Sequence, residues 1–135
     1  MNTSLHSPST ETRSLQQLLA DWATAVRGTN HPQPPPYDGP DVQITHLTEN
    51  TNEVGPGACF VARVRATSDG HPYIGQALAR GASLILAQRP AAQLELTIPP
   101  GAAYLEVADT AEAVAWLAAA WEGFPGRHLV MIGIT

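Results

Sequence analysis

Short apolar runs alternate with helix-like segments along most of this 135-residue chain, and this alternation restricts its fold more than any other feature. Runs typical of buried strands occupy 58–64, 83–88 and 103–107. Residues 41–47 alternate apolar and polar side chains as a half-buried strand does, with Val42, Ile44 and His46 on one face. Strands that alternate with helices predict an α/β fold with a mixed, partly parallel sheet, flanking helices and right-handed crossovers.

Three segments carry the signals of helix ends. Two of them begin with a capping-box pair, Ser14 with Gln17 and Asp109 with Glu112. The third has Pro72 in its first turn, and Gly28 and Gly81 are C-terminal stops. The faces expected to be buried are Leu15, Leu18, Leu19, Trp22 and Val26; Ile74, Ala77 and Leu78; and Val114, Leu117, Ala118 and Trp121.

Composition divides the chain into a tail, one domain and a C-terminal linker. Residues 1–12 are polar and expected to be disordered, and residues 13–124 are expected to form a single domain. Within this domain, the Pro-rich stretch 29–40 is expected to be an extended connector outside the core, and Pro56-Gly57 suits a type II turn. The remaining residues, 125–135, contain a strongly apolar strand pattern that leads out of the domain.

Charge and motif content argue against several classes of function. The net charge is −5 without any basic run, which argues against a nucleic-acid or anionic-membrane surface. No apolar run approaches the ~20 residues that span a bilayer, and the polar N-terminus is not a signal peptide. The five histidines and the single cysteine, Cys59, show no HxxxH, HExxH or CxxC spacing, so no metal site is expected. We expect a cytoplasmic protein with Cys59 in its core.

The loop RVRATSDGHPY (63–73) holds the candidate binding residues. Its small and hydroxyl-bearing side chains belong to Ala66, Thr67 and Ser68. If the preceding strand extends this far, Arg63 and Arg65 face opposite sides, and the helix that starts at Pro72 presents an N-terminus that favours anions. This combination suits a phosphate or diphosphate; the alternative is a solvated turn closed by Asp69-Gly70.

The order of these segments resembles the N-terminal domain of the Mur ligases, most closely the MurE type. The stretch ITHLTENTNEVGPGACFVARVRATSDGHPYIGQALARGASLILAQ (44–88) is similar to that family's pattern ITGITxDSRxVxPGDLFVAxxGxxxDGhxfIxxAxxxGAxaiv. The helix around LQQLLADW (15–22) resembles the family's first helix, and 107–135 resembles the region that links to its next domain. Matching residues in the central stretch are Ile44, Thr45, Thr48, Val54, Pro56, Gly57, Phe60, Val61, Ala62, Asp69, Gly70, Tyr73, Ile74, Ala77, Gly81 and Ala82.

This resemblance implies a substrate and assigns residues to it. The substrate of the family's MurE type is UDP-N-acetylmuramoyl-dipeptide, and Leu47 and Thr48 would flank its uracil. The family's DSR motif falls on 50–52, so the Thr51 hydroxyl would approach the uridine. The family's diphosphate and ribose contacts fall on Arg65, Ala66, Thr67 and Ser68. The acid and arginine of DSR, and the His and Gln of the family's GHQA-type loop, are replaced in this chain.

The resemblance also implies which further domains would follow residue 135 in a full-length member of the family. In the family, the strand that ends here at Gly133 and Thr135 leads into a GTNGKT loop of a central ATPase domain, and a third domain binds the incoming amino acid. ATP and Mg are therefore expected for a full-length parent but not for this chain, which contains no lysine. We expect a binding domain for a UDP-sugar-peptide that lacks the central and C-terminal ligase domains. The alternatives are a stand-alone or degenerate nucleotide-sugar-binding module and a MurE-like amide ligase for another substrate.

Overall fold

The structure is a computed structural model that describes residues 12–122. Almost all of the predicted tail 1–12 lies outside these residues. The predicted strand within 125–135, with Gly133 and Thr135, lies outside them as well.

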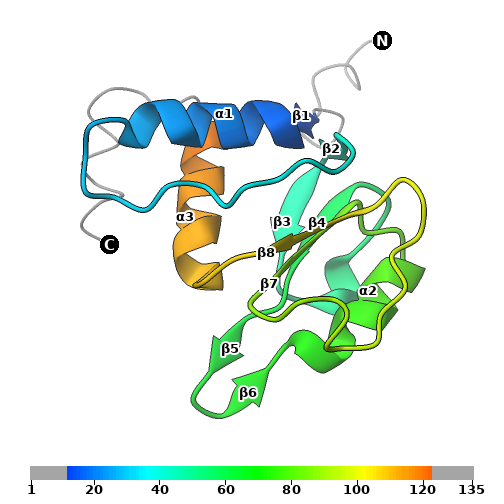
Figure 1. Cartoon of the computed structure of the whole chain (residues 1–135). Coiled ribbons are helices and arrows are strands. Elements are labelled where there is room, and N and C mark those ends of the chain that lie inside the picture. Colours follow the sequence, from blue (N-terminus) through cyan, green and yellow to red (C-terminus); the bar gives the residue numbers. More distant parts are fainter. Residues whose placement is uncertain (1–11, 123–135) are drawn as a thin grey trace, which may run out of the picture.

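A parallel sheet of four strands forms the centre of the molecule (Figure 1). Its strands follow one another across the sheet in chain order: β3 (His46–Thr48), β4 (Ala58–Val61), β7 (Leu84–Ala87) and β8 (Ala103–Glu106). Leu47 pairs with Cys59, Cys59 with Leu84, and Leu84 with Ala103. Because all four strands run the same way, their carboxyl ends share one edge of the sheet. The predicted α/β fold with parallel pairing is confirmed.

Each face of the sheet is buried beneath its own layer of helix and loop. The helices are α1 (Leu15–Val26), α2 (Ile74–Ala79) and α3 (Thr110–Trp121). Along β4, Cys59 and Val61 join the core that α1 and α3 cover, whereas Ala58 and Phe60 join the core beneath α2. Burial on both faces explains why the strand segments are continuously apolar instead of alternating.

Capping residues define the start of α1 much as the sequence predicts. Ser14 Oγ accepts the backbone N–H of Gln17 at 3.2 Å. The Gln17 side chain donates to Asp21 and does not return to the cap, so only half of the predicted capping box forms. Asp41 completes the cap instead, because it accepts from Ser14 Oγ and from the backbone N–H of Gln16 at 2.9 Å.

The buried face of α3 differs from the predicted one. Leu117 is buried as expected, but Val114, Ala118 and Trp121 are only half-buried. Trp116 takes their place in the core and stacks on Trp22, with ring centroids 6.3 Å apart. Residues 110–121 are apolar around most of the helix, so their spacing does not single out one face.

Two of the predicted strands are shorter than expected. Residues 41–47 divide between β3 and a separate strand, β2 (Gln43–Ile44), which pairs antiparallel with β1 (Arg13–Ser14). Val42 and Ile44 are buried, but His46 is exposed.

The segment 58–64 ends as a sheet strand at Val61. Before it, Gly57 has a φ of +88° and the Ala58 N–H donates to the Gly55 carbonyl, which confirms the predicted turn at Pro56-Gly57. The predicted third helix begins as a 3₁₀ turn, η4 (His71–Tyr73), and continues as α2.

The Pro-rich connector 29–40 contributes no buried residue to the core but packs against its surface. It contains neither helix nor strand, as expected. However, the indole N–H of Trp22 donates to the Pro32 carbonyl at 3.0 Å, and the Tyr37 ring packs against the core beneath α1 and α3. An indole at a core boundary needs a hydrogen-bond acceptor, and the connector supplies it.

Candidate functional site

Polar side chains gather at the carboxyl edge of the sheet, which is where open α/β sheets bind ligands. The residues that follow the four strands at this edge include Glu49, Arg63, Arg89 and Asp109. An antiparallel hairpin, β5 (Val64–Arg65) and β6 (Ser68–Asp69), projects beyond the same edge (Figure 1). The loop predicted to bind phosphate is therefore a hairpin.

A cavity of about 350 Å³ opens at the carboxyl ends of β3 and β4. Its lining residues are Leu47, Thr48, Glu49, Asn50, Glu53, Val61 and Val114. The Thr48 hydroxyl donates to Glu53 Oε1 at 2.9 Å and accepts the backbone N–H of Asn50 at 3.1 Å. The structure thus brings Leu47 and Thr48, both predicted to flank uracil, together on one concave surface.

Glu49 connects this cavity to the hairpin. Its Oε2 accepts from Arg63 Nη1 at 2.6 Å, and its Oε1 accepts from Arg65 Nη2 at 2.8 Å. Because β4 ends at Val61, the two arginines do not face opposite sides as an extended strand would require; both bind one carboxylate. Within this cluster of three side chains, two guanidinium groups on one carboxylate leave one net positive charge, while Glu53 adds a negative charge to the cavity lining. The more exposed of the two, Arg65, can offer that charge to an anion.

Glu49 is not among the site residues predicted from the sequence. The available signal was its position directly after a strand, because the carboxyl ends of parallel strands meet at one edge. A single acidic residue in a polar stretch does not show that it will bind two arginines 14 and 16 residues later.

The remaining predicted diphosphate residues lie together on the hairpin. Arg65 pairs with Ser68, so Ala66 and Thr67 form the tip. All four residues are exposed. The structure therefore places one guanidinium and two hydroxyls on a single projection beside the cavity.

The predicted anion site at the start of the next helix is already filled by the protein itself. Asp69 Oδ1 accepts the backbone N–H of His71 at 2.9 Å, in the first turn of η4. This bond, a second from the His71 ring and an ion pair with Arg89 hold the pKa of the Asp69 carboxyl well below its usual range. The carboxylate is therefore ionised and would repel a phosphate at this point.

Thr51 lies beside the cavity without lining it. It is the first residue of a 3₁₀ turn, η3 (Thr51–Glu53), which Asn50 caps by accepting the backbone N–H of Asn52 at 2.9 Å. Since Asn50 and Glu53 both line the cavity, Thr51 belongs to the segment that forms its rim.

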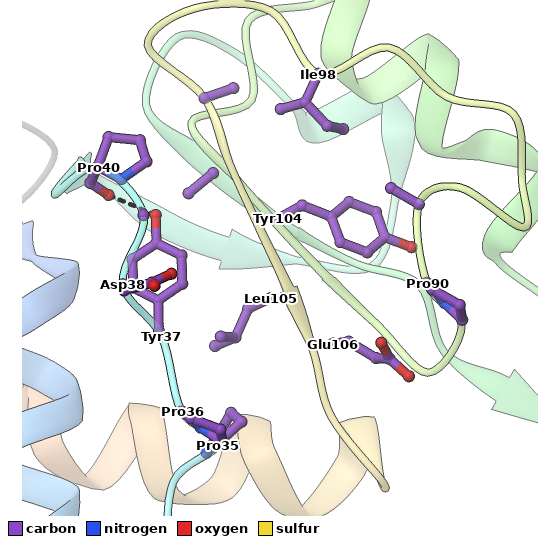
Figure 2. Close-up of a pocket in the computed structure, with 14 residues that line it drawn as sticks. Pro35, Pro36, Tyr37, Asp38, Pro40, Pro90, Ile98, Tyr104, Leu105 and Glu106 are labelled. Carbon is purple, nitrogen blue, oxygen red and sulfur yellow. Dashed lines mark hydrogen bonds between the residues drawn. The ribbon is translucent and has the colours of Figure 1, made fainter.

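A second cavity, of about 680 Å³, lies between the connector and β8 and contains none of the predicted binding residues (Figure 2). On one side of it, the Tyr37 hydroxyl donates to the Pro40 carbonyl. On the other, the Tyr104 hydroxyl donates to the Arg89 carbonyl, and burial raises the pKa of Tyr104 to about 12. Both rings are hydrogen-bonded to the backbone, and the Pro-rich connector forms one wall of this cavity, a role that its composition does not predict.

Within residues 12–122, no cluster of three or more His, Cys, Asp or Glu side chains could hold a metal ion. None of the helices described for these residues is both long and apolar enough to cross a membrane.

Comparison with known sequences finds a matching family model and several similar ligases. The model of the Mur ligase family, catalytic domain, matches residues 43–122. UDP-N-acetylmuramoyl-L-alanyl-D-glutamate–2,6-diaminopimelate ligase of Lactiplantibacillus plantarum is 39% identical over 95 residues, which are 70% of this chain and 18% of that protein. UDP-N-acetylmuramyl-tripeptide synthetase of Deinococcus radiodurans is 36% identical over 117 residues, covering 87% of this chain and 22% of the relative. The chain thus spans about a fifth of the length of these curated relatives.

Comparison with solved structures finds a related ligase. UDP-N-acetylmuramoylalanyl-D-glutamyl-2,6-diaminopimelate–D-alanyl-D-alanyl ligase from Acinetobacter baumannii superimposes with a TM-score of 0.56 at 25% identity, over 84% of this chain and 22% of that one. A crystal structure of MurF from the same organism gives a TM-score of 0.55 at 25% identity, over 82% and 21% of the two chains. The sequence relatives are therefore MurE-type enzymes, whereas the structural neighbours are MurF.

Proposed function

This chain belongs to the Mur ligase family, and we propose that it binds the UDP end of a UDP-N-acetylmuramoyl-peptide as the N-terminal domain of a MurE-like, ATP-dependent amino acid ligase of peptidoglycan precursor synthesis. The relatives at 36–39% identity have names of this type. The proposal concerns the UDP end alone, since that is the part of the substrate for which the described residues offer complementary groups.

One observation supports the proposal most directly: the cavity and the excess positive charge lie side by side and share Glu49. The cavity volume falls within the range of small-molecule sites, about 300–1,000 Å³, and would hold a uracil ring between Leu47 and Thr48. Thr51, on the rim, would approach the uridine.

The diphosphate would then lie against the hairpin. Arg65 supplies a planar guanidinium, which suits phosphate oxygens, and Thr67 and Ser68 supply hydroxyl donors. Ala66 at the tip is small enough to let the backbone come close to the ligand. The ligand would compete with Glu49 for Arg65, so we expect the Arg65–Glu49 ion pair to loosen when UDP binds.

For the full-length parent, we propose the domain division expected from the sequence. Residues 13–124 would be the UDP-substrate-binding domain. Residues 125–135, with Gly133 and Thr135, would lead into the ATP-binding loop of a central domain. Such an enzyme would use ATP and Mg in the cytoplasm to activate a substrate carboxylate, before an amino acid bound by a C-terminal domain forms the amide.

Calorimetric titration of the 135-residue chain tests the binding proposal. We expect heat from UDP and a weaker response from uridine, because uridine lacks the diphosphate. Arg65→Ala should weaken UDP much more than uridine, whereas Thr51→Val should weaken both. Arg80→Ala is the matched control, because Arg80 is an exposed arginine at the end of α2. It should change the affinity for neither UDP nor uridine. The absence of heat at millimolar UDP would overturn the proposal.

The same titration tests the roles assigned to individual residues. The residues 50–52 and 65–68 differ from the family pattern, and this difference favours either a degenerate module or a ligase for another substrate. UDP binding that does not depend on Thr51 or Arg65 would show that these residues have been assigned the wrong role.

A further inference from the structure

The hairpin that bears the proposed diphosphate contacts has little apolar burial to fix its direction. Its two strands pair with each other, and among the described strands with no other. Val64 is 41% exposed, and the residues from Arg65 to Ser68 are all exposed. Something other than a core must therefore hold the hairpin beside the cavity.

On the side of β7, a chain of hydrogen bonds connects the base of the hairpin to the sheet. Asp69 Oδ1 lies 2.6 Å from Nδ1 of His71, and Nε2 of the same ring lies 3.0 Å from the backbone nitrogen of Gln88. A backbone N–H can only donate, so Nε2 accepts and Nδ1 bears the proton that is donated to Asp69. The His71 side chain is 1% exposed, so both ring nitrogens are used inside the protein.

The same series of hydrogen bonds continues on both sides of His71. Arg89 Nη1 donates to Asp69 Oδ2 at 2.9 Å, which adds a second connection to the hairpin from the segment that follows β7. The Gln88 side-chain oxygen accepts the backbone N–H and the hydroxyl of Thr110, at 2.9 and 3.1 Å, where α3 begins. The hairpin is therefore connected to β7, and through Gln88 to α3.

Gly70 packs closely against the backbone at the base of the hairpin. A Cβ at this position would lie 3.0 Å from Ala62 Cα and from the Arg63 nitrogen, both of them backbone atoms. The Gly70 N–H donates to the Arg63 carbonyl at 2.8 Å. The base of the hairpin is thus held by close packing and a backbone hydrogen bond, and the bonds of Asp69 and His71 lie directly beside it.

We propose that Asp69, His71 and Gln88 are positioning residues that hold the hairpin at the angle at which Arg65, Thr67 and Ser68 can meet a diphosphate. This inference rests on the proposed function. The three residues act through the hairpin and not on the ligand: the His71 ring is fully bonded, and the ionised Asp69 would repel phosphate.

Substitutions at Asp69 in the 135-residue chain test this positioning role. Asp69→Ala removes the bonds to His71 and Arg89, and we expect UDP affinity to fall about tenfold or more, because small displacements of binding groups are costly. In the ligand-free variant, NMR relaxation should show greater mobility of the Thr67 and Ser68 amides. Asp69→Asn keeps the acceptor for His71 and should recover most of the affinity.

Asp41→Ala is the matched control, because Asp41 is also an aspartate that accepts backbone and hydroxyl hydrogen bonds, but at the start of α1. It should lower stability without altering the hairpin amides or UDP affinity. If it alters them as much as Asp69→Ala does, the role of Asp69 is general stability and the proposal is overturned.

A second variant, His71→Gln, gives an independent test should Asp69→Ala fail to fold. It should raise the mobility of the same two amides; unchanged mobility together with unchanged UDP affinity would overturn the proposal. If the unsubstituted chain does not bind UDP, the proposed function fails. In that case the amide mobilities alone still decide whether these residues hold the hairpin.

Discussion

The sheet strands β4 and β7 and the hairpin of β5 and β6 are neighbours in the chain, but different forces hold them. Every side chain of β4 and β7 is buried, and apolar contacts on both faces determine their position. The hairpin is exposed and is positioned by ion pairs and hydrogen bonds from Glu49, Asp69 and His71. In this molecule, apolar burial builds the scaffold and polar contacts orient the candidate site.

The largest expected difference between the two regions is in the stability that is lost when a side chain is truncated in each. Phe60→Ala should lower the free energy of unfolding by about 3–5 kcal/mol, because Phe60 is 1% exposed in the core beneath α2. Val64→Ala in the hairpin should change it by less than about 0.5 kcal/mol. Urea unfolding of both variants measures this. Equal losses would show that the hairpin is part of the core after all.

A smaller difference is expected when a methyl group is added to a glycine. Gly70→Ala forces a Cβ against backbone atoms at the base of the hairpin, and we expect a cost of about 1–3 kcal/mol. Gly75→Ala on α2 is the control: a Cβ there meets no atom within 4 Å, so the substitution should stabilise the protein by up to about 1 kcal/mol. Denaturant unfolding compares the two. A Gly70 variant as stable as the original would contradict the close packing described for this position.

The smallest expected effect is the change in the stability contribution of Asp69 when the pH is lowered. The folded-state pKa of Asp69 lies below its unfolded value, so its contribution to stability is complete above the unfolded pKa of about 4 and is lost progressively as the pH falls below that value. In Asp69→Asn this contribution is absent. The stability difference between the two proteins should therefore be constant at neutral pH and shrink below pH 4. A difference that does not change with pH would show that the Asp69 charge does not stabilise the hairpin.

The same division between forces explains what could be predicted from the sequence. Apolar runs predicted β4, β7 and β8 to within a few residues, and Ser14 and Asp109 predicted the start of two helices. Both signals are local. The buried face of α3 was not predictable from spacing, because nearly all of its residues are apolar and the partner, Trp22, is far away in sequence.

The candidate site was less predictable than the fold. Leu47 and Thr48 come together with the end of β4 because strand order brings them there. The contacts of Glu49 with Arg63 and of His71 with Gln88 join residues from different strands, and no local pattern encodes them. The sequence of the loop 63–73 showed that hydroxyls and arginines occur together, but not that a hairpin would present them.

The reactivity of Cys59 can distinguish opening of the scaffold from movement of the hairpin. It is the one cysteine of the chain, it has no exposed surface beneath α1 and α3, and burial raises the pKa of its thiol. A thiol reagent can react with it only after the helical layer separates from the sheet and the thiol ionises in water. The labelling rate therefore reports how often the scaffold opens, whereas movements of the hairpin leave that rate unchanged.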